Sequence, residues 1–214
     1  RFRAEDLLRF NNVNFDPLTE TVCLPCVWTL PFNLHYLQYN LNFYYTYLAN
    51  WPEYFLVTEM PHERKIMGYS SYPIFLFYFF FFKILIMGKA EGTGEKWHGH
   101  VTAVTVAPDC RRIGIAQYLM AQLESISEHI HNGYFVDLFV RQSNKIAITM
   151  YEKLGYTVYR RVIKYYSGTE DAFDMRKAMP RDVQKKSIIP LKHPVTPDDL
   201  EWSWKKNWTK NGAH

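Results

Sequence analysis

A basic turn in the middle of the sequence has the residue types that bind a phosphate group. It lies within residues 104–116, Val-Thr-Val-Ala-Pro-Asp-Cys-Arg-Arg-Ile-Gly-Ile-Ala, where a β-branched run gives way to a helical pattern. The first amides of a helix starting near Gly114 have no internal acceptor, and the helix dipole is positive there, so a pyrophosphate can bind. Gly114 also lets the backbone approach a ligand, and Ala116 keeps that side of the helix thin. Arg111 and Arg112 add positive charge, although the pattern alone also fits an ordinary turn with two solvated arginines.

A second pair of polar side chains follows on the next predicted helix. Asn144 and Tyr151 are seven residues apart, about two helical turns, so both can lie on one face. An amide at the start of the helix can hydrogen-bond an extended ligand, and a phenol can donate a proton to a leaving group. By themselves, the two residues also fit a helix cap and a core aromatic.

Histidines and cysteines give weaker signals. His98 and His100 flank one glycine, but the spacing suggests no third metal ligand, so we predict no metal site. Cys23 and Cys26 form a Cys-x-x-Cys pair, which needs a second pair for zinc or a strand-to-helix setting for redox chemistry. Cys110 falls in the basic turn, where a nucleophilic role is not indicated.

Hydrophobic periodicity predicts the elements that position these residues. Period-two or continuous apolar runs predict strands at 54–58, 66–69, 100–107, 134–140, 156–166 and 172–175. Helical periodicity predicts a helix and loop over 5–18, and helices over 113–130 and 146–154. Ser143 is the predicted N-cap and Gly155 the predicted C-cap glycine of the last of these helices. The order predicts an α/β fold, a mixed sheet flanked by helices in a single domain.

Composition narrows the class of protein. The 214 residues carry a net charge of +4, and 48% of them are hydrophobic, which predicts a packed core. The basic excess does not gather into the patch expected of a nucleic-acid binder. With three cysteines and no signal peptide at the start of the sequence, we expect a cytoplasmic protein without a disulfide framework. Pro, Lys and Asp dominate from residue 180, so we predict a domain over 1–179 and an extended tail over 180–214.

The basic turn and the second helix together resemble the GNAT acetyltransferase superfamily. Arg-x-x-Gly-x-Ala after a Val-x-Val-x-Pro strand resembles its acetyl-CoA loop, and residues 140–156 resemble the strand and helix that follow. The resemblance implies acetyl-CoA as co-substrate, no metal, and a splayed strand pair with the thioester in the gap. It also implies a set of cofactor-binding residues: Val104, Val106, Arg111, Arg112, Gly114, Ile115, Ala116, Asn144 and Tyr151.

Longer stretches resemble the catalytic subunits of N-terminal acetyltransferase B. They are residues 6–11, 16–21, 51–55, 87–92, 97–104, 136–141, 174–177 and 185–191. The resemblance implies acetylation of nascent chains that start Met-Asp, Met-Glu, Met-Asn or Met-Gln. It also implies a helical-repeat auxiliary subunit that docks the enzyme at the ribosome, with no membrane or sequence-specific nucleic acid as partner. Another N-terminal or lysine specificity, or an inactive GNAT-like binding module, stays open as an alternative.

The same resemblance assigns roles at the substrate. Glu20, His100, Thr102, Tyr165 and Tyr166 are implied to bind the peptide, and Tyr151 and His100 to be catalytic. An α-amine has a pKa near 8, so direct attack on the thioester is reasonable near neutral pH. The proton acceptor could be His100, or a water held by Glu20 or by the backbone.

Two segments depart from the family pattern, at about 26–42 and 70–85. The second is rich in phenylalanine and interrupts what should be one continuous strand. It is too short for a membrane span of ~20 residues. As a hydrophobic hairpin it would expose an apolar patch, unless a partner covered it. Our hypothesis is a retained intron, which sequencing of the mature transcript tests.

Overall fold

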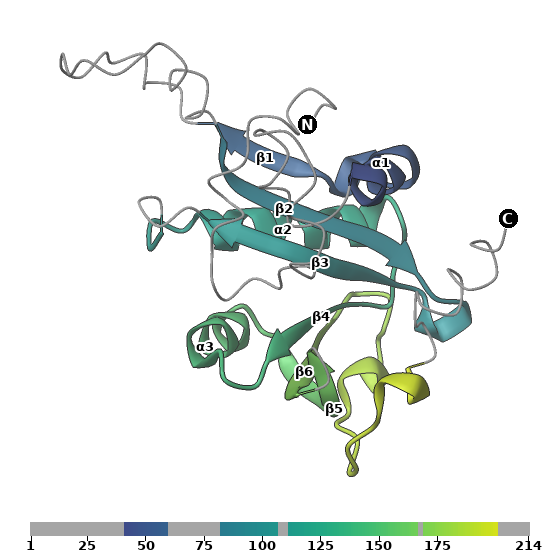
Figure 1. The fold of residues 1–214 in the computed structure, drawn as a ribbon. Helices are drawn as coiled ribbons and strands as arrows, with labels where there is room; N and C mark the ends of the chain where they lie inside the picture. The colour runs from purple at the N-terminus through teal and green to yellow at the C-terminus, as the bar shows by residue number, and fades with distance from the viewer. Residues whose placement is uncertain (1–40, 60–81, 107–110, 167–168, 201–214) are drawn as a thin grey trace, which may run out of the picture. The chain divides into compact units, whose positions relative to one another are not determined.

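A computed structural model describes residues 41–59, 82–106, 111–166 and 169–200. The helices are α1 (Leu41–Asn50), α2 (Ile115–His129) and α3 (Lys145–Lys153), with short 3₁₀ turns η4 (Pro52–Tyr54), η6 (Gly94–Lys96), η8 (Lys186–Ile188) and η9 (Pro197–Asp199). The strands are β1 (Leu56–Glu59), β2 (Phe82–Glu91), β3 (His98–Val106), β4 (Phe135–Arg141), β5 (Thr157–Tyr166) and β6 (Glu170–Ala178) (Figure 1). None of the helices in these ranges has the length and apolar character needed to cross a bilayer.

The described strands form a mixed sheet in the order β1-β2-β3-β4-β6-β5. β3 and β4 are parallel, whereas β1–β2, β4–β6 and β5–β6 are antiparallel. A parallel pair needs a crossover, and α2 lies in the connection between β3 and β4. The predicted α/β fold with a mixed sheet and helices is therefore confirmed.

The chain divides into two compact units. One comprises residues 1–89 and 102–123, and the other comprises residues 90–101 and 124–214. β2, β3 and α2 each contribute residues to both units.

The first unit has an aromatic core beside the β1–β2 pair. α1 buries Tyr44 and Tyr47 because they lie three residues apart on one face, and Phe43 contacts Tyr47 at 4.7 Å between ring centroids. Pro52 follows the helix and starts η4, so β1 begins at Leu56 rather than at the predicted residue 54.

Part of each predicted insertion belongs to a regular element. β2 begins at Phe82 and pairs with β1 from Glu59↔Phe82 to Leu56↔Ile86, so residues 82–85 extend the strand. The strand can extend over these residues because Phe and Ile have a high preference for strands. α1 begins at Leu41, inside the segment predicted to end at 42. The rest of both segments, and the predicted helix over 5–18 and strand over 66–69, lies outside the described residues.

The second unit is organised around β4, which is buried on both faces. Phe135, Val136, Leu138 and Val140 are buried, and so is the one charged residue among them, Asp137. β4 pairs with β3 from His98↔Phe135 to Val101↔Leu138, and with β6 along its whole length. β5 and β6 form a hairpin (Figure 1). This register places His100 directly opposite Asp137.

The N-cap of α3 lies one residue later than predicted. Asn144, not Ser143, is the N-cap, and its side chain accepts a hydrogen bond from the Ala147 amide at 3.1 Å. The predicted cap at Ser143 is wrong because its amide and hydroxyl instead donate to Glu170 on β6. Gly155 follows the C-cap with φ +91°, a left-handed conformation that favours glycine.

The segment after residue 179 follows β5. The Leu191 and Val195 amides donate to the carbonyls of Tyr159 and Arg161, and Val195 forms a parallel bridge with Val162. Leu200 closes this run in a small apolar cluster with Val162. Residues 180–200 therefore pack on the second unit, and the predicted domain boundary at 179 stays a prediction.

We expect Asp182→Asn to loosen this C-terminal run. The Asp182 carboxylate accepts from the amides of Lys186 (3.1 Å) and Ser187 (2.8 Å). Burial alone raises the pKa of Asp182, but these donors outweigh it and lower the pKa below its usual 3.8. Because the folded-state pKa is lowered, the stabilisation is present above pH 3.8 and lost as the pH falls through the folded-state pKa. Urea unfolding at pH 7 should show a loss of about 1 kcal/mol. The gap between variant and parent should narrow toward pH 3, and a gap independent of pH would contradict this account.

Candidate active site

The basic turn of the first unit is exposed and leads directly into α2. Residues 107–110 lie outside the described residues, but Arg111 to Gly114 form turns and bends, and α2 starts at Ile115. The Arg111 Nε donates to the Val106 carbonyl at 3.0 Å, which ties the turn back to the end of β3. The arginines and Gly114 are exposed, whereas Ile115 and Ala116 are half-buried. An anion can therefore reach the start of α2.

Position 114 favours glycine because of its backbone conformation, and not because a larger side chain would clash. Its φ is +87°, whereas a Cβ added there would meet nothing within 4 Å. Arg112, two residues earlier, also has a positive φ of 66°. These two left-handed residues, on either side of Ile113, turn the backbone into the helix, so that N–H groups of the turn can face one ligand. The positive φ gives a second reason for glycine here, and its close approach to a ligand stays a prediction.

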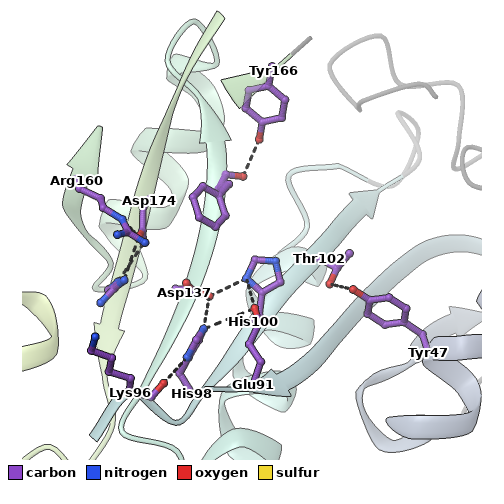
Figure 2. A network of polar contacts seen from close by, with 12 residues as sticks. Tyr47, Glu91, Lys96, His98, His100, Thr102, Asp137, Arg160, Tyr166 and Asp174 are labelled. Atoms are coloured by element: carbon purple, nitrogen blue, oxygen red, sulfur yellow. Dashed lines mark hydrogen bonds and ion pairs between the residues drawn. The ribbon is translucent and has the colours of Figure 1, made fainter. Parts of the chain in front are cut away.

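A cluster of two histidines and two carboxylates lies in the second unit. The His100 Nδ1 and the Asp137 Oδ1 are 2.8 Å apart, and the His98 Nε2 lies 3.4 Å from the same oxygen. The His98 Nδ1 is 2.7 Å from the Lys96 carbonyl, which can only accept, so this nitrogen donates. Figure 2 shows Asp137 between the two rings, with Glu91 nearby.

Asp137 and His98 each shift the pKa of the other. Burial alone would raise the pKa of Asp137, but the two imidazoles hold it well below its usual value. Burial lowers the pKa of His98, yet the charge of Asp137 and the Lys96 carbonyl raise it overall. Asp137 is therefore ionised near neutral pH and acts only as an acceptor. It follows that the His100 Nδ1–H donates to Asp137, which leaves Nε2 as the proton-accepting nitrogen of a neutral His100.

Aromatic side chains extend from His100 along the second unit. The ring centroids of Phe139 and His100 are 5.8 Å apart. Phe139 also stacks on Tyr165, with 4.7 Å between the ring centroids. Tyr166 is buried, and its hydroxyl donates to the Phe139 carbonyl at 3.0 Å. Arg141 lies over the Tyr166 ring at 4.2 Å. Tyr166 thus holds this arrangement in place, whereas the half-buried Tyr165 is the better candidate to touch a ligand.

Tyr151 is the candidate proton donor on α3. Burial raises the pKa of Tyr151 to about 12, so the phenol stays protonated near neutral pH. Its ring packs edge-to-face on Tyr156, with 5.9 Å between centroids. The Tyr156 hydroxyl donates to Glu124, which also binds the Lys177 ammonium at 2.6 Å. Tyr156 and its two partners therefore fix the position of Tyr151.

Comparison with known proteins agrees with this geometry. Residues 24–156 match the acetyltransferase (GNAT) family. The chain is 55% identical over 202 residues to the N-terminal acetyltransferase B complex catalytic subunit of Arabidopsis thaliana, which covers 94% of this chain and 97% of that protein. The chain belongs to the GNAT family, among the type B catalytic subunits.

Solved structures of type B enzymes are similar to this chain. Naa20 of Chaetomium thermophilum, in complex with a bisubstrate analogue, is 38% identical with a TM-score of 0.71, over 92% of this chain and 96% of that one. A type B acetyltransferase complex bound to CoA contains a chain that is 36% identical with a TM-score of 0.62, over 84% and 97% of the two chains. The predicted resemblance to type B catalytic subunits is therefore confirmed.

The predicted site residues of this type B subunit fall in different parts of the structure. Thr102, Val104, Val106, Arg111, Arg112, Gly114, Ile115 and Ala116 belong to the first unit, and His100, Asn144, Tyr151, Tyr165 and Tyr166 to the second. Glu20 lies outside the described residues. Within the second unit, Phe139 links His100 to Tyr165. The predicted splay concerns strands that run through both units, so it stays a prediction, as do the individual ligand contacts.

Several residues that contact the predicted site residues were missed from the sequence. Asp137 and Glu91 surround the histidines, and the Tyr47 hydroxyl accepts a hydrogen bond from the Thr102 Oγ1 at 3.0 Å. Asp137 carries a signal that could have found it, because it is the one charge in a run that is apolar on both faces. Glu91 and Tyr47 have no such signal, since their pairing depends on contacts between distant segments.

Proposed function

We propose that this chain transfers acetyl from acetyl-CoA to the α-amine of an N-terminal methionine followed by Asp, Glu, Asn or Gln. The observation that carries the proposal is the 2.8 Å hydrogen bond from the His100 Nδ1–H to Asp137. This hydrogen bond fixes the orientation and the tautomer of the His100 ring. The type B resemblance implies that His100 binds the peptide. The likeness to an enzyme solved with a bisubstrate analogue supports the same activity.

The reaction needs one nucleophilic step and one proton transfer to the enzyme. The neutral α-amine attacks the thioester carbonyl carbon, the C–N bond forms, the C–S bond breaks and the thiolate of CoA leaves. The amine nitrogen then loses a proton, which the His100 Nε2 accepts. The resulting imidazolium is stabilised by Asp137 through Nδ1–H. The side chain of His100 is 14% exposed, so a bound peptide can reach it.

Tyr151 stabilises the leaving thiolate by a hydrogen bond rather than by complete proton transfer. A simple thiol has a pKa of about 8.5, and the pKa of Tyr151 is about 12. Full transfer from the phenol would therefore be uphill by about 5 kcal/mol. A phenol O–H that points at the sulfur still lowers the energy of the developing anion. This refines the expectation that Tyr151 protonates the thiolate outright.

We expect Tyr151→Phe to lower kcat by about tenfold to a hundredfold, because one neutral hydrogen bond to the developing anion is lost. Steady-state kinetics with saturating acetyl-CoA would measure this, and KM for the peptide should stay nearly constant. Tyr118→Phe on the exposed face of α2 is the matched control. A loss of about 10⁴-fold would instead mean that the phenol transfers its proton completely.

The basic turn is the part of the chain that holds the cofactor. Exposed amides at the start of α2, with Arg111 and Arg112 beside them, suit the pyrophosphate of acetyl-CoA. The Asn144 Oδ1 is already used as the cap of α3, so its NH₂ group is the part that can donate to the pantetheine arm. A relative in the type B complex has been solved with CoA bound, which supports the same cofactor here.

The chain works with an auxiliary subunit, as its Arabidopsis relative is a subunit of a complex. We infer that this partner is a helical-repeat protein and that the complex acts in the cytoplasm on nascent chains at the ribosome. The family resemblance of the sequence supports this inference. Binding of the purified complex to ribosomes that carry Met-Asp nascent chains would test it.

A peptide panel tests the proposed function. Acetyl transfer is measured on peptides starting Met-Asp, Met-Glu, Met-Asn, Met-Leu, Ser and Ala, with and without the auxiliary subunit. Selective turnover of the first three is expected. Preference for Met-Leu, Ser or Ala would mean another specificity, and loss of all turnover with acetyl-CoA still bound would indicate an inactive binding module.

A further inference from the structure

Four donor atoms in the second unit converge on one point. They are the His98 Nε2, the His100 Nδ1, the Asp137 Oδ1 and a Glu91 carboxylate oxygen (Figure 2). The ligand atoms of Glu91, His98 and His100 all lie within 4.8 Å of one another. The sequence spacing suggested only two ligands, because Glu91 and Asp137 come from other strands, β2 and β4.

The separations between these atoms fit a small tetrahedral ion. Zinc binds nitrogen and oxygen at about 2.0–2.2 Å, so the ligand atoms of a tetrahedron lie about 3.3–3.6 Å apart. Here the separations are 2.8 Å (His100–Asp137), 3.4 Å (His98–Asp137), and 3.9 Å from each histidine to Glu91. These four of the six edges of a tetrahedron bracket the ideal value, and the edge between the two histidines is at most 4.8 Å.

The surroundings prepare His98 and Asp137 for this role. The His98 Nδ1 donates to the Lys96 carbonyl at 2.7 Å, which is the contact that orients metal-binding histidines and directs Nε2 at the ion. Parallel stacking on Phe135, with 4.5 Å between centroids, fixes the plane of the same ring. His98 and Asp137 are almost fully buried, whereas Glu91 is 21% exposed and gives an ion a way in.

We propose that Glu91, His98, His100 and Asp137 form a binding site for a divalent transition metal of the zinc class. Two imidazoles with two carboxylates suit Zn²⁺ or Co²⁺, whereas Mg²⁺ and Ca²⁺ prefer oxygen alone. Two carboxylates supply the negative charge that compensates a buried divalent ion. The ion replaces the proton on the His100 Nδ1 and any proton on the His98 Nε2, so binding releases protons.

The site is inhibitory rather than catalytic in this proposal. A metal on the His100 Nδ1 breaks the hydrogen bond to Asp137, on which the proposed base depends. That consequence rests on the proposed function, but metal binding itself does not. The test therefore reads binding directly and leaves turnover as a separate measurement.

Cobalt spectroscopy on the full chain with its auxiliary subunit tests the proposal. The chelator-treated complex is titrated with Co²⁺, whose visible absorption bands report tetrahedral coordination, and Zn²⁺ is then added in competition. Glu91→Gln and His100→Gln alter ligands from separate strands. The exposed His129 provides the control His129→Gln. A triple variant, Cys23→Ser, Cys26→Ser and Cys110→Ser, excludes thiol ligands. Circular dichroism checks that each variant folds.

We expect one Co²⁺ per complex with tetrahedral bands, unchanged in the histidine control and in the cysteine variant. Glu91→Gln and His100→Gln should each weaken binding by at least about tenfold. Three results would overturn the proposal: no saturable Co²⁺ binding, bands that survive both ligand variants, or bands that disappear in the cysteine variant. Mg²⁺ at the same concentration should leave the Co²⁺ bands unchanged, and displacement by Mg²⁺ would also contradict it.

Discussion

His100→Gln is expected to lower kcat by about 10²–10⁴-fold, the effect of losing a positioned proton acceptor. Glutamine retains a polar side chain of similar reach, but it cannot take a proton from the attacking amine. The neighbouring hydrogen bond to Asp137 gives His100 its orientation and stabilises the imidazolium that forms. Initial rates on a Met-Asp peptide at saturating acetyl-CoA measure the effect.

The control for this variant is His129→Gln, which removes an exposed histidine on α2 and should leave kcat unchanged. A role for His100 in peptide binding alone would raise KM and leave kcat near the parent value. If kcat falls by less than tenfold in His100→Gln but collapses in Glu20→Gln, a water held by Glu20 is the acceptor instead.

Asp137→Asn should destabilise the protein by about 3 kcal/mol or more, because breaking a buried ion pair leaves a charge without compensation. The carboxylate is buried in β4 and faces the rings of both His98 and His100. An asparagine oxygen can still accept from His100, but it carries no charge to balance the protonated form of His98, which Asp137 favours. Urea unfolding at neutral pH, monitored by circular dichroism, measures the change.

The control for Asp137→Asn is Asp198→Asn, which replaces an exposed aspartate. This control should change the free energy of unfolding by less than about 0.5 kcal/mol. A loss below about 1 kcal/mol in Asp137→Asn would show that His98 becomes neutral at little cost. The same variant should also lower kcat, because the imidazolium that forms on His100 loses the negative charge that stabilises it. Unchanged turnover would show that the charge of Asp137 does not contribute to catalysis.

The sequence by itself determined the parts of this protein that depend on local pattern. Alternation and helical periodicity located β3, α2, β4, α3 and the β5–β6 hairpin to within a few residues, because each period reflects which face is buried. The basic turn before α2 and the pair Asn144 and Tyr151 were found because their chemistry depends on spacing along the chain. Long matching stretches identified the type B family.

Local competition for hydrogen bonds limited what the sequence could settle. Ser143 and Asn144 are both good N-caps, and sequence preference does not choose between them. Ser143 donates to Glu170 on β6, so Asn144 is the N-cap.

The boundary of β2 also depends on tertiary structure. The pattern over 70–85 could not show that β2 already begins at Phe82, because that boundary depends on pairing with β1.

Only the tertiary structure brought together the cluster around His100. Asp137 is 37 residues from His100 in the chain, and the parallel register of β3 and β4 places them opposite each other. Glu91 joins them from β2, so a pair of histidines that lacked a third ligand in the sequence becomes a four-donor site. The physical reason is that register and strand order are set by packing over the whole sheet, whereas the sequence pattern records only which face of each strand is buried.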